Sequence, residues 1–245
     1  MTASREQFGR VARAYADSAV HARGEDLALL RAAVSTGARV IDVGTGAGHA
    51  LAAVGAGAAI AVGVDPTPEM LAVARDVLGR RGVAAVLVQA DAIALPFADA
   101  SFDAAVSRLA AHHFPDAAAA FVEIARVLRP RSRLCFVDNY APADAGLDTW
   151  IDALERLRDP SHVRSHTLDG WLQLLGRAGF ASHVATRLQT KLQTEDWLAR
   201  SQTPPQHADR AREMLRTAPS AARERFRIQE GGFSSLKAVI VATKR

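Results

Sequence analysis

The sequence predicts an α/β fold built on a doubly wound, mostly parallel sheet of seven strands. Three observations predict it. Short, nearly continuous apolar runs rich in valine, isoleucine and alanine recur along the chain, and segments with apolar residues at helical spacing separate most of them. A glycine-rich turn follows the first run. Strand–helix alternation favours parallel strands joined by right-handed crossovers, and ligands bind such sheets at turns of this kind.

Five apolar runs are expected to form parallel strands that are buried on both faces. Each is only about eight residues long and nearly uninterrupted, which is typical of strands covered by helices on both sides. They span residues 38–45, 59–66, 84–91, 102–109 and 133–140. Two later runs, 182–190 and 235–244, are expected to extend the sheet at one edge, with the last as a candidate antiparallel strand.

Helical patterns surround and separate these strands. Residues 66–82 start with proline and end with glycine, and 115–130 is bounded by prolines, which are helix start and stop signals. Residues 4–35 are expected to form two helices, and Thr167 is a candidate N-cap for a helix over 167–179. A basic helical stretch follows near 194–225. These N-terminal and late helices are expected to act as lid elements.

The chain is expected to form a single domain with three parts. Residues 1–37 form an N-terminal helical cap, 38–140 a ligand-binding core, and 141–245 the substrate-side helices and C-terminal strands. A length of 245 residues suits one large α/β domain. Hydrophobic residues make up 49% and charged residues 23%, which excludes a disordered or coiled-coil chain.

Cysteine content and apolar run lengths bear on the compartment. Cys135 is the single cysteine, which excludes an intramolecular disulfide and a cysteine-built zinc site and favours a cytoplasmic setting. No apolar run reaches the roughly 18 residues that a membrane helix needs, and the polar N-terminus lacks a secretory signal. A cytoplasmic protein without a membrane span is therefore expected.

The glycine-rich turn is the most distinctive local feature. Gly44, Gly46 and Gly48 follow the first strand in the run VIDVGTGAG, where they allow tight turning and close approach of a ligand. A dinucleotide fingerprint would read G-x-G-x-x-G, but His49 stands where the third glycine belongs. The turn alone therefore favours nucleotide-type binding without selecting a cofactor.

Acidic residues end the next two strands. Asp65 ends the second strand, where a carboxylate can accept two ribose hydroxyl protons. Asp91 ends the third strand and precedes Ala92, so the carboxylate could accept from an adenine amino group while the Ala92 amide donates to a ring nitrogen. A turn or helix cap is the alternative for each aspartate alone. Their placement around one glycine turn favours a shared nucleoside site.

Taken together, these segments resemble the class I S-adenosylmethionine-dependent methyltransferases. They are most similar to the small-molecule branch that includes the ubiquinone and menaquinone biosynthesis methyltransferases. The similar stretches are VIDVGTGAG, GVDPTPEMLAVAR, QADAIALPFADASFDAAVS, and FVEIARVLRP followed by RLCFVD. The resemblance covers about residues 5–180. Arg131-Ser132 departs from it, because the family usually has a glycine pair after Arg-Pro, and this puts the turn there in question.

The resemblance implies a Rossmann-like methyltransferase fold with S-adenosylmethionine as cofactor. It implies that the Gly44-Thr45-Gly46 turn packs against the methionine part, Asp65 binds the ribose, and Asp91 and Ala92 bind adenine. It places a backbone carbonyl of Ser107 or Arg108 near the amino group. Asp42 resembles the family's acidic residue that orders the turn or takes the amino group through water.

The implied reaction is direct in-line transfer of a methyl group to an O, N or C atom of a small-molecule acceptor. Such a transfer needs alignment and exclusion of water, and a base only for a weakly acidic acceptor. Arg108, His112 and His113 follow the fourth strand and are the first candidates for catalysis. A second cluster, Arg158 with His162, could bind an anionic acceptor or act as a base. Helix caps and solvated loop residues are the alternatives for both clusters.

Other site types are disfavoured. Tyr15 and His21 could line a lid, although ordinary packing explains each alone. His162 and His166 have a zinc-like spacing but lie near Pro160 without an intervening glutamate. Asp138-Asn139 ends the fifth strand without the acidic partner after strand four that catechol-type magnesium sites need. No metal is therefore expected.

Nucleic-acid partners are also disfavoured. The arginines of 210–227 are interleaved with Glu213 and Glu224, which is typical of a solvated helix face. A nicotinamide-dependent oxidoreductase and a non-catalytic S-adenosylmethionine-binding regulator stay open as alternative functions. A homodimer is compatible with the sequence.

Overall fold

The computed structural model describes residues 3–16 and 18–245, and seven strands of these residues form one sheet in the order β3-β2-β1-β4-β5-β7-β6. Neighbours from β1 to β5 pair in parallel, whereas β7 runs antiparallel to both β5 and β6. The predicted fold class and the antiparallel last strand are confirmed. The strands are β1 (Arg39–Val43), β2 (Ile60–Asp65), β3 (Val86–Gln89), β4 (Phe102–Arg108), β5 (Leu128–Asn139), β6 (Phe180–Gln193) and β7 (Gly232–Lys244).

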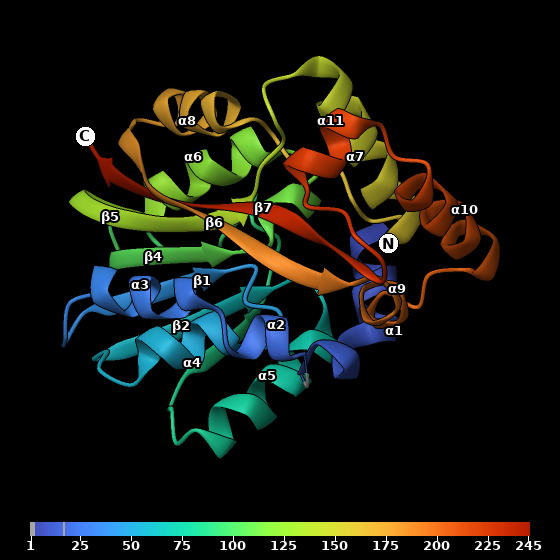
Figure 1. Ribbon diagram of the computed structural model, residues 1–245. Helices are drawn as coiled ribbons and strands as arrows, with labels where there is room; N and C mark the ends of the chain where they lie inside the picture. Colours follow the sequence, from blue (N-terminus) through green and yellow to red (C-terminus); the bar gives the residue numbers. More distant parts are fainter. Residues whose placement is uncertain (1–2, 17) are drawn as a thin grey trace.

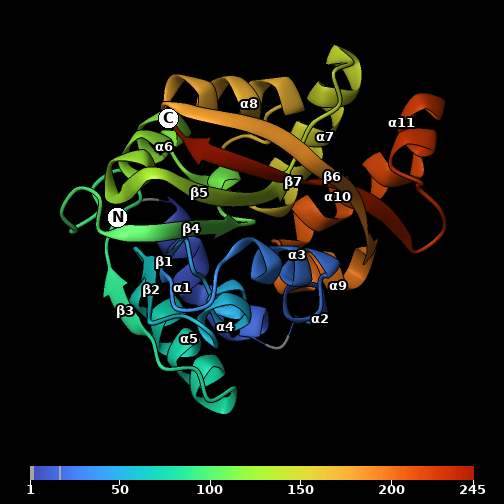
Figure 2. The same ribbon diagram turned by 90° about the vertical axis from the view of Figure 1, so that its left-hand side faces the viewer.

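Helices cover both faces of the sheet (Figures 1 and 2). On one face lie α3 (Glu25–Ala33), α4 (His49–Gly55) and α5 (Pro68–Arg80), and on the other α6 (Ala117–Val127) and α8 (Leu168–Arg177). Successive strand residues serve opposite faces, as a period of two requires. Val40 packs in the core beneath α3 and α4, whereas Ile41 packs in the core beneath α6 and α8.

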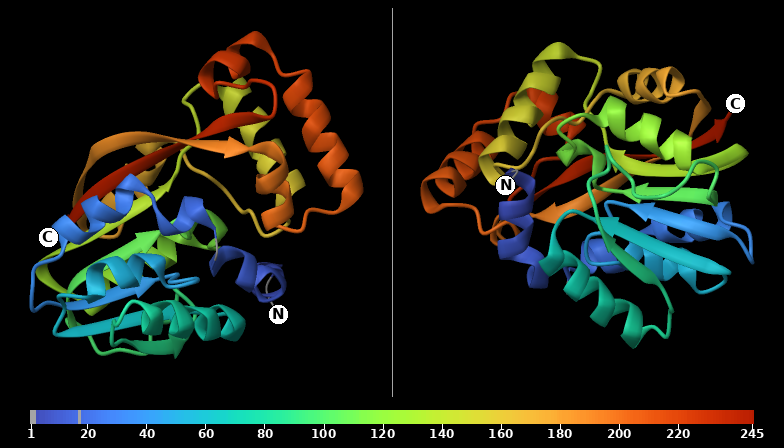
Figure 3. Two further views of the ribbon diagram at one scale, coloured as in Figure 1. Left: turned by 60° about the horizontal axis from the view of Figure 1, so that its bottom comes forward. Right: turned by 180° about the vertical axis from the view of Figure 1, so that it is seen from behind.

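A further group of helices lies beyond the sheet (Figure 3). It contains α7 (Ala145–Arg158), α9 (Thr194–Arg200), α10 (Pro205–Arg216) and α11 (Ser220–Arg225). Trp197, Leu198 and Phe233 anchor its own small apolar core. The predicted basic stretch over 194–225 is helical but divided into three, because prolines at 204, 205 and 219 interrupt it.

The N-terminal part corrects one prediction. Two helices were expected over 4–35, whereas the described residues form three: α1 (Ala3–Ala16), α2 (Ala19–Ala22) and α3. The chain turns into α3 at Gly24, where a Cβ atom would lie 2.0 Å from Asp26 Oδ1 and 2.7 Å from Arg108 Nη2. Since only glycine fits there, the break follows from a buried ion pair that no local pattern reveals. α1 packs against α5 and α9.

The backbone at Arg131, before the main part of β5, adopts a conformation that favours glycine although no glycine is present. The predicted helix over 115–130 ends at Val127, and residues 128–130 already belong to β5. Arg131 has φ of +64°, in the left-handed region that favours glycine. In the part of the chain that the structure describes, no helix is long and apolar enough to cross a membrane.

Candidate functional site

The glycine turn lies at the carboxyl end of β1 and leads into α4. Gly44, Gly46 and Gly48 have φ values of +75°, +51° and +82°, which explains why glycine occupies each position. The amides of Gly44 and Thr45 both donate to the Val64 carbonyl at 2.9 Å. A Cβ atom on Gly44 would lie 2.5 Å from the Ala110 Cβ. The turn therefore packs closely against Ala110 at Gly44, where any side chain would clash, whereas a Cβ atom on Gly46 would meet nothing within 4 Å.

Asp65 holds the turn from the neighbouring strand. Its Oδ2 accepts from the Gly46 amide and its Oδ1 from the Thr67 amide, both at 2.9 Å. Burial raises the pKa of this carboxyl to about 6, because the charged form is poorly solvated. Each oxygen keeps a second lone pair for a ligand hydroxyl.

Asp42 lies beneath the same turn. Its Oδ2 accepts from the Thr45 hydroxyl at 2.7 Å, while its Oδ1 finds no hydrogen-bond partner among the described residues. Burial raises the pKa of Asp42 to about 7. A buried acceptor without a partner is costly and is available to an additional donor.

A large cavity lies over this edge of the sheet, and we call it the glycine-turn cavity. It contains about 990 Å³ of space, part of it open to solvent. Predicted site residues gather on its wall, whereas Asp42 and Ser107 lie behind it. The predicted residues on the wall are Gly44, Thr45, Gly46, Asp65, Asp91, Ala92, Arg108 and His113.

A second cavity of about 550 Å³ adjoins the first, and we call it the inner chamber. Phe8, Tyr15, His21, Leu109 and His113 line both cavities, so these residues form the boundary between them. The inner chamber extends toward the ends of β6 and β7 and toward α7 and α9. The two cavities together form a two-part site beneath α1 and α2.

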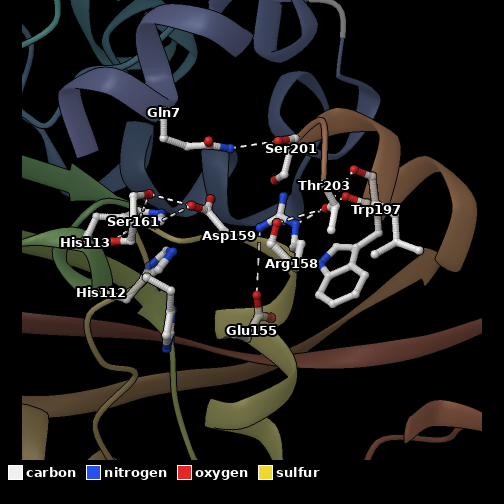
Figure 4. Close-up of polar contacts among 12 residues, drawn as sticks. Gln7, His112, His113, Glu155, Arg158, Asp159, Ser161, Trp197, Ser201 and Thr203 are labelled. Carbon is white, nitrogen blue, oxygen red and sulfur yellow. Dashed lines mark hydrogen bonds and ion pairs between the residues drawn. The ribbon is translucent and has the colours of Figure 1, made fainter. Parts of the chain in front are cut away.

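His113 stands on the boundary with a defined tautomer. Its Nδ1 lies 3.1 Å from the Ser161 carbonyl oxygen and 3.2 Å from the Ser161 hydroxyl (Figure 4). Because a carbonyl oxygen can only accept, Nδ1 carries the proton and Nε2 keeps a free lone pair. Burial and the neighbouring charge of His112 lower the pKa of His113 well below 6.5. The ring is therefore neutral at pH 7.

Asp159 supports this arrangement from the end of α7. Its Oδ1 accepts from the Ser161 amide at 2.9 Å and from the Ser161 hydroxyl at 2.6 Å. The Ser161 hydroxyl proton is thus directed at Asp159, which leaves the hydroxyl oxygen to accept from His113 (Figure 4). Asp159 orients His113 through Ser161 without lining either cavity itself.

The protonated form of His112, the neighbour of His113, is favoured by Asp138. Its Nδ1 lies 2.5 Å from Asp138 Oδ1, and Asp138 Oδ2 accepts from the Ala111 amide at 2.8 Å. Burial alone would lower the pKa of His112, but the Asp138 charge and hydrogen bond raise it. Asp138 therefore fixes the short 3-10 turn (Ala111–His113) on β5. Among the described residues, no three His, Cys, Asp or Glu side chains gather as a metal site.

Arg108 and His162 serve other contacts. The Arg108 guanidinium pairs with the buried Asp26 carboxylate and donates to the His21 carbonyl at 2.9 Å. Lys237 Nζ also donates to Asp26, at 2.9 Å. The two ion pairs of Asp26 therefore connect α3 with β4 and β7. His162 Nε2 lies 3.2 Å from Asp152 Oδ1 and lines a separate cavity of about 340 Å³.

Several wall residues were missed by the sequence analysis. Leu109 lines both cavities with φ of +52°, and leucine gives no signal for that backbone conformation. Phe8 stands edge-on to His113, with ring centroids 4.8 Å apart. Arg200 and Trp197 reach the inner chamber from α9. No spacing in the sequence marks these four side chains as site residues, and only the tertiary fold places them there.

The sequence of this chain is similar to those of known methyltransferases. The family model described as "Methyltransferase domain" matches residues 41–136. Over 225 residues the chain is 40% identical to the uncharacterized methyltransferase YcgJ of Bacillus subtilis, covering 89% of this chain and 88% of YcgJ. It is 38% identical over 122 residues to a demethylmenaquinone methyltransferase of Thermus thermophilus, covering 49% of this chain and 54% of that protein.

Solved structures agree with the family. The crystal structure of Bacillus subtilis YcgJ has a TM-score of 0.84 at 36% identity, covering 89% of this chain and 97% of that chain. A structure of a protein from Bacillus halodurans C-125 has a TM-score of 0.85 at 31% identity, covering 90% of this chain and 99% of that one. The chain belongs to the class I S-adenosylmethionine-dependent methyltransferases. It is a methyltransferase enzyme with S-adenosylmethionine as methyl donor, as the sequence resemblance implied.

Proposed function

We propose that the glycine-turn cavity binds S-adenosylmethionine and that a small-molecule acceptor occupies the inner chamber. Asp65 carries the proposal, because its two oxygens are fixed by backbone amides and still face the cavity with free lone pairs. The family favours methyl transfer over the nicotinamide-dependent oxidoreductase and the non-catalytic regulator considered from the sequence.

The wall residues fit each part of the donor. The turn at Gly44, Thr45 and Gly46 suits the methionine part, since it lines the cavity and a Cβ atom on Gly46 would meet nothing within 4 Å. Asp65 accepts hydrogen bonds from the ribose hydroxyls. Asp91 and Ala92, which line the same cavity just beyond the end of β3, face the adenine. A backbone carbonyl of Ser107 or Arg108 is a candidate for the amino group, and the unpartnered Asp42 oxygen, behind the wall, is a candidate through water.

The chain's own residues align the acceptor and receive its proton. S-adenosylmethionine supplies an activated methyl group on a positively charged sulfur. His113 Nε2 lies where the two cavities meet, so it can take the proton of an acceptor hydroxyl or amine. Phe8 and Leu109 provide apolar surface at the same boundary, which helps to exclude water. His113 is the catalytic residue in this proposal, and Asp159 is a positioning residue.

The lining of the inner chamber supports a small acceptor. Apolar and aromatic side chains combine there with a few charged groups, as is typical of small-molecule sites, around about 550 Å³ of space that is partly open to solvent. The acceptor atom in this proposal is O, N or C. The walls of the inner chamber come from residues within 1–37, 38–140 and 141–245, so these segments act as one domain in this proposal. A cytoplasmic location and a homodimer stay predictions.

Calorimetry with S-adenosylhomocysteine tests the donor site. Asp65→Ala should weaken binding by about 2–3 kcal/mol, because it removes charge-assisted hydrogen bonds to the ribose. Asp169→Ala, an exposed aspartate on α8, is the matched control and should bind as the unmodified protein does. Unchanged affinity in Asp65→Ala would show the ribose assignment to be wrong. A protein that ignored S-adenosylhomocysteine and bound a nicotinamide dinucleotide would refute the whole proposal.

A further inference from the structure

We infer that the methyl acceptor is an organic anion whose carboxylate or phosphate group binds between Arg158 and Arg200 in the inner chamber. This inference rests on the proposed function, because it assigns the chemistry of the molecule that occupies the chamber. Three features carry it: the charges on the chamber wall, the way in which each guanidinium is held, and the apolar surface between them and His113.

Positive charge exceeds negative charge on the chamber wall. Arg158, Arg200 and Lys237 line it, and Glu155 is the acidic residue among its described lining residues. Lys237 is already bonded to Asp26 at 2.9 Å, and His112, also on the wall, is bonded to Asp138. Two guanidinium groups therefore line the chamber with one carboxylate, while Asp159 acts on Arg158 from behind the wall. An oxyanion placed between the two guanidinium groups would be stabilised by both.

Arg158 is fixed in place before any ligand binds. Its Nε donates to the Trp197 carbonyl at 3.2 Å, its Nη2 donates to the Tyr15 hydroxyl at 3.3 Å, and its guanidinium lies over the Trp197 ring at 5.3 Å. Its Nη1 forms an ion pair with Glu155 Oε2 at 3.8 Å, a distance too long for a hydrogen bond (Figure 4). Arg158 is thus preorganised and keeps donor capacity for a ligand.

Arg200 is less well satisfied by the protein. Its Nη1 lies 3.5 Å from the Ser18 hydroxyl, and its buried Nε has no hydrogen-bond partner among the described residues. No carboxylate of residues 3–16 or 18–245 forms an ion pair with it. Burial and the like charge of Arg158 lower its pKa. A half-buried guanidinium beside a second one is stabilised by an oxyanion that bonds to both.

The chamber also fixes the rest of the acceptor. Val20, Leu192 and Trp197 supply apolar and aromatic surface for its body. His113 stands at the opposite boundary, next to the glycine-turn cavity. An acceptor with its anionic group at the two arginines can therefore present a hydroxyl or amine to His113 Nε2. The acceptor class is an apolar small molecule with one oxyanion and one nucleophilic group.

A ligand-binding experiment tests the inference on protein saturated with S-adenosylhomocysteine. Benzoate and phenyl phosphate serve as anionic probes, and benzamide is the neutral probe of similar shape. At least one of the two anions should raise the melting temperature, and benzamide should leave it unchanged. A response to phenyl phosphate indicates a phosphate group on the acceptor, and a response to benzoate indicates a carboxylate. Arg200→Gln should weaken binding of that anion about ten- to a hundredfold, since charge-assisted hydrogen bonds are lost. Arg210→Gln, an exposed arginine of α10, should respond as the unmodified protein does.

The outcomes separate this inference from the proposed function. S-adenosylhomocysteine affinity, measured on every variant, shows that the donor site is folded in Arg200→Gln. The inference is wrong, and the donor site stands, if S-adenosylhomocysteine binds but neither anion does. It is also wrong if benzamide stabilises the unmodified protein as much as the anions do, or if Arg200→Gln binds the anion as tightly as the unmodified protein does. If S-adenosylhomocysteine itself does not bind, the proposed function fails first.

Discussion

His112 and His113 lie side by side, with ring centroids 4.1 Å apart, and their pKa values are displaced in opposite directions. Asp138 raises the pKa of His112 despite its burial. Burial and the charge of His112 then keep His113 neutral, while the Ser161 carbonyl fixes its proton on Nδ1. The charged form is thus favoured in His112 and the neutral form in His113, which leaves His113 as the base.

The first prediction concerns the base. His113→Gln should lower the turnover of a hydroxyl or amine acceptor about 10²–10⁴-fold, because Gln cannot take the proton. The affinity for S-adenosylhomocysteine should stay within about twofold, since the donor contacts remain. His207→Gln, at an exposed position on α10, is the control. Steady-state rates identical to those of the unmodified enzyme would remove His113 from the mechanism.

The second prediction concerns the neighbouring cation. His112→Gln removes a positive charge beside His113, so the pKa of His113 should rise. Because the base must be neutral, activity is lost as the pH falls through its pKa. The acidic limb of kcat/KM should therefore move to higher pH in this variant. A pH–rate profile with an unmoved acidic limb would show that His112 does not set the protonation of His113.

Much of the sheet could be predicted because its strands are encoded locally. β1 and β2 are buried on both faces, so their uninterrupted apolar runs predict them as strands without any tertiary information. The start of β5 could not be predicted in this way. Residues 128–130 read as the end of a helix, and only the Phe102–Leu128 pairing makes them a strand. The break at Gly24 likewise depends on a distant ion pair.

The two halves of the site differ in the same way. The glycine turn, Asp65 and Asp91 each lie at or just beyond a strand end, where topology brings ligand contacts to one edge, so sequence position predicted their gathering. The inner chamber is lined by helices and by the ends of β6 and β7, and no spacing in the sequence encodes how these elements pack together. Arg158 was noted only within a polar cluster, and Arg200 was one arginine among many in a basic stretch.

The third prediction links donor binding to protons. The pKa of Asp65 is about 6 in the ligand-free protein, and hydroxyl donors from a bound ribose should lower it. Binding then releases a proton below pH 6, so affinity for S-adenosylhomocysteine should rise as the pH increases from 5 to 6 and level off above it. Calorimetry in buffers of different ionisation enthalpy measures this release.

Asp65→Asn is the control for the proton linkage. It should bind more weakly but lose the part of the pH dependence that Asp65 causes, leaving any contribution from Asp42 with its pKa of about 7. Equal pH dependence in both proteins would assign the released proton to another group.

The fourth prediction concerns the buried carboxylate that joins the N-terminal helices to the core. Burial alone would raise the pKa of Asp26, but the hydrogen bonds and charges of Arg108 and Lys237 lower it. Asp26→Asn leaves two buried cations without their anion and should cost about 3–5 kcal/mol of unfolding free energy. Glu25→Gln, at the exposed neighbouring position, should change it by less than about 0.5 kcal/mol.

Urea unfolding measures both variants, and the pH dependence provides a second check. Because the folded pKa of Asp26 lies below its unfolded value, its contribution is present above about pH 4 and is lost as the pH falls through the folded pKa. The difference between Asp26→Asn and the unmodified protein should therefore shrink in acid. A difference that is independent of pH would show that shape, and not charge, explains the loss.

The last prediction returns to the position where this chain departs from the family's glycine pair. Arg131 is exposed and has φ of +64°, a conformation that costs a residue with a Cβ atom about 1 kcal/mol. Arg131→Gly removes that cost and should raise the unfolding free energy by up to about 1 kcal/mol, offset in part by the greater freedom of the unfolded chain. Arg133→Gly, two residues further in the paired part of β5, should lower it by about 0.5–1 kcal/mol. If both glycines destabilised the protein equally in urea, the turn at Arg131 would not be strained, and arginine there would be as well suited to the backbone as the glycine it replaces.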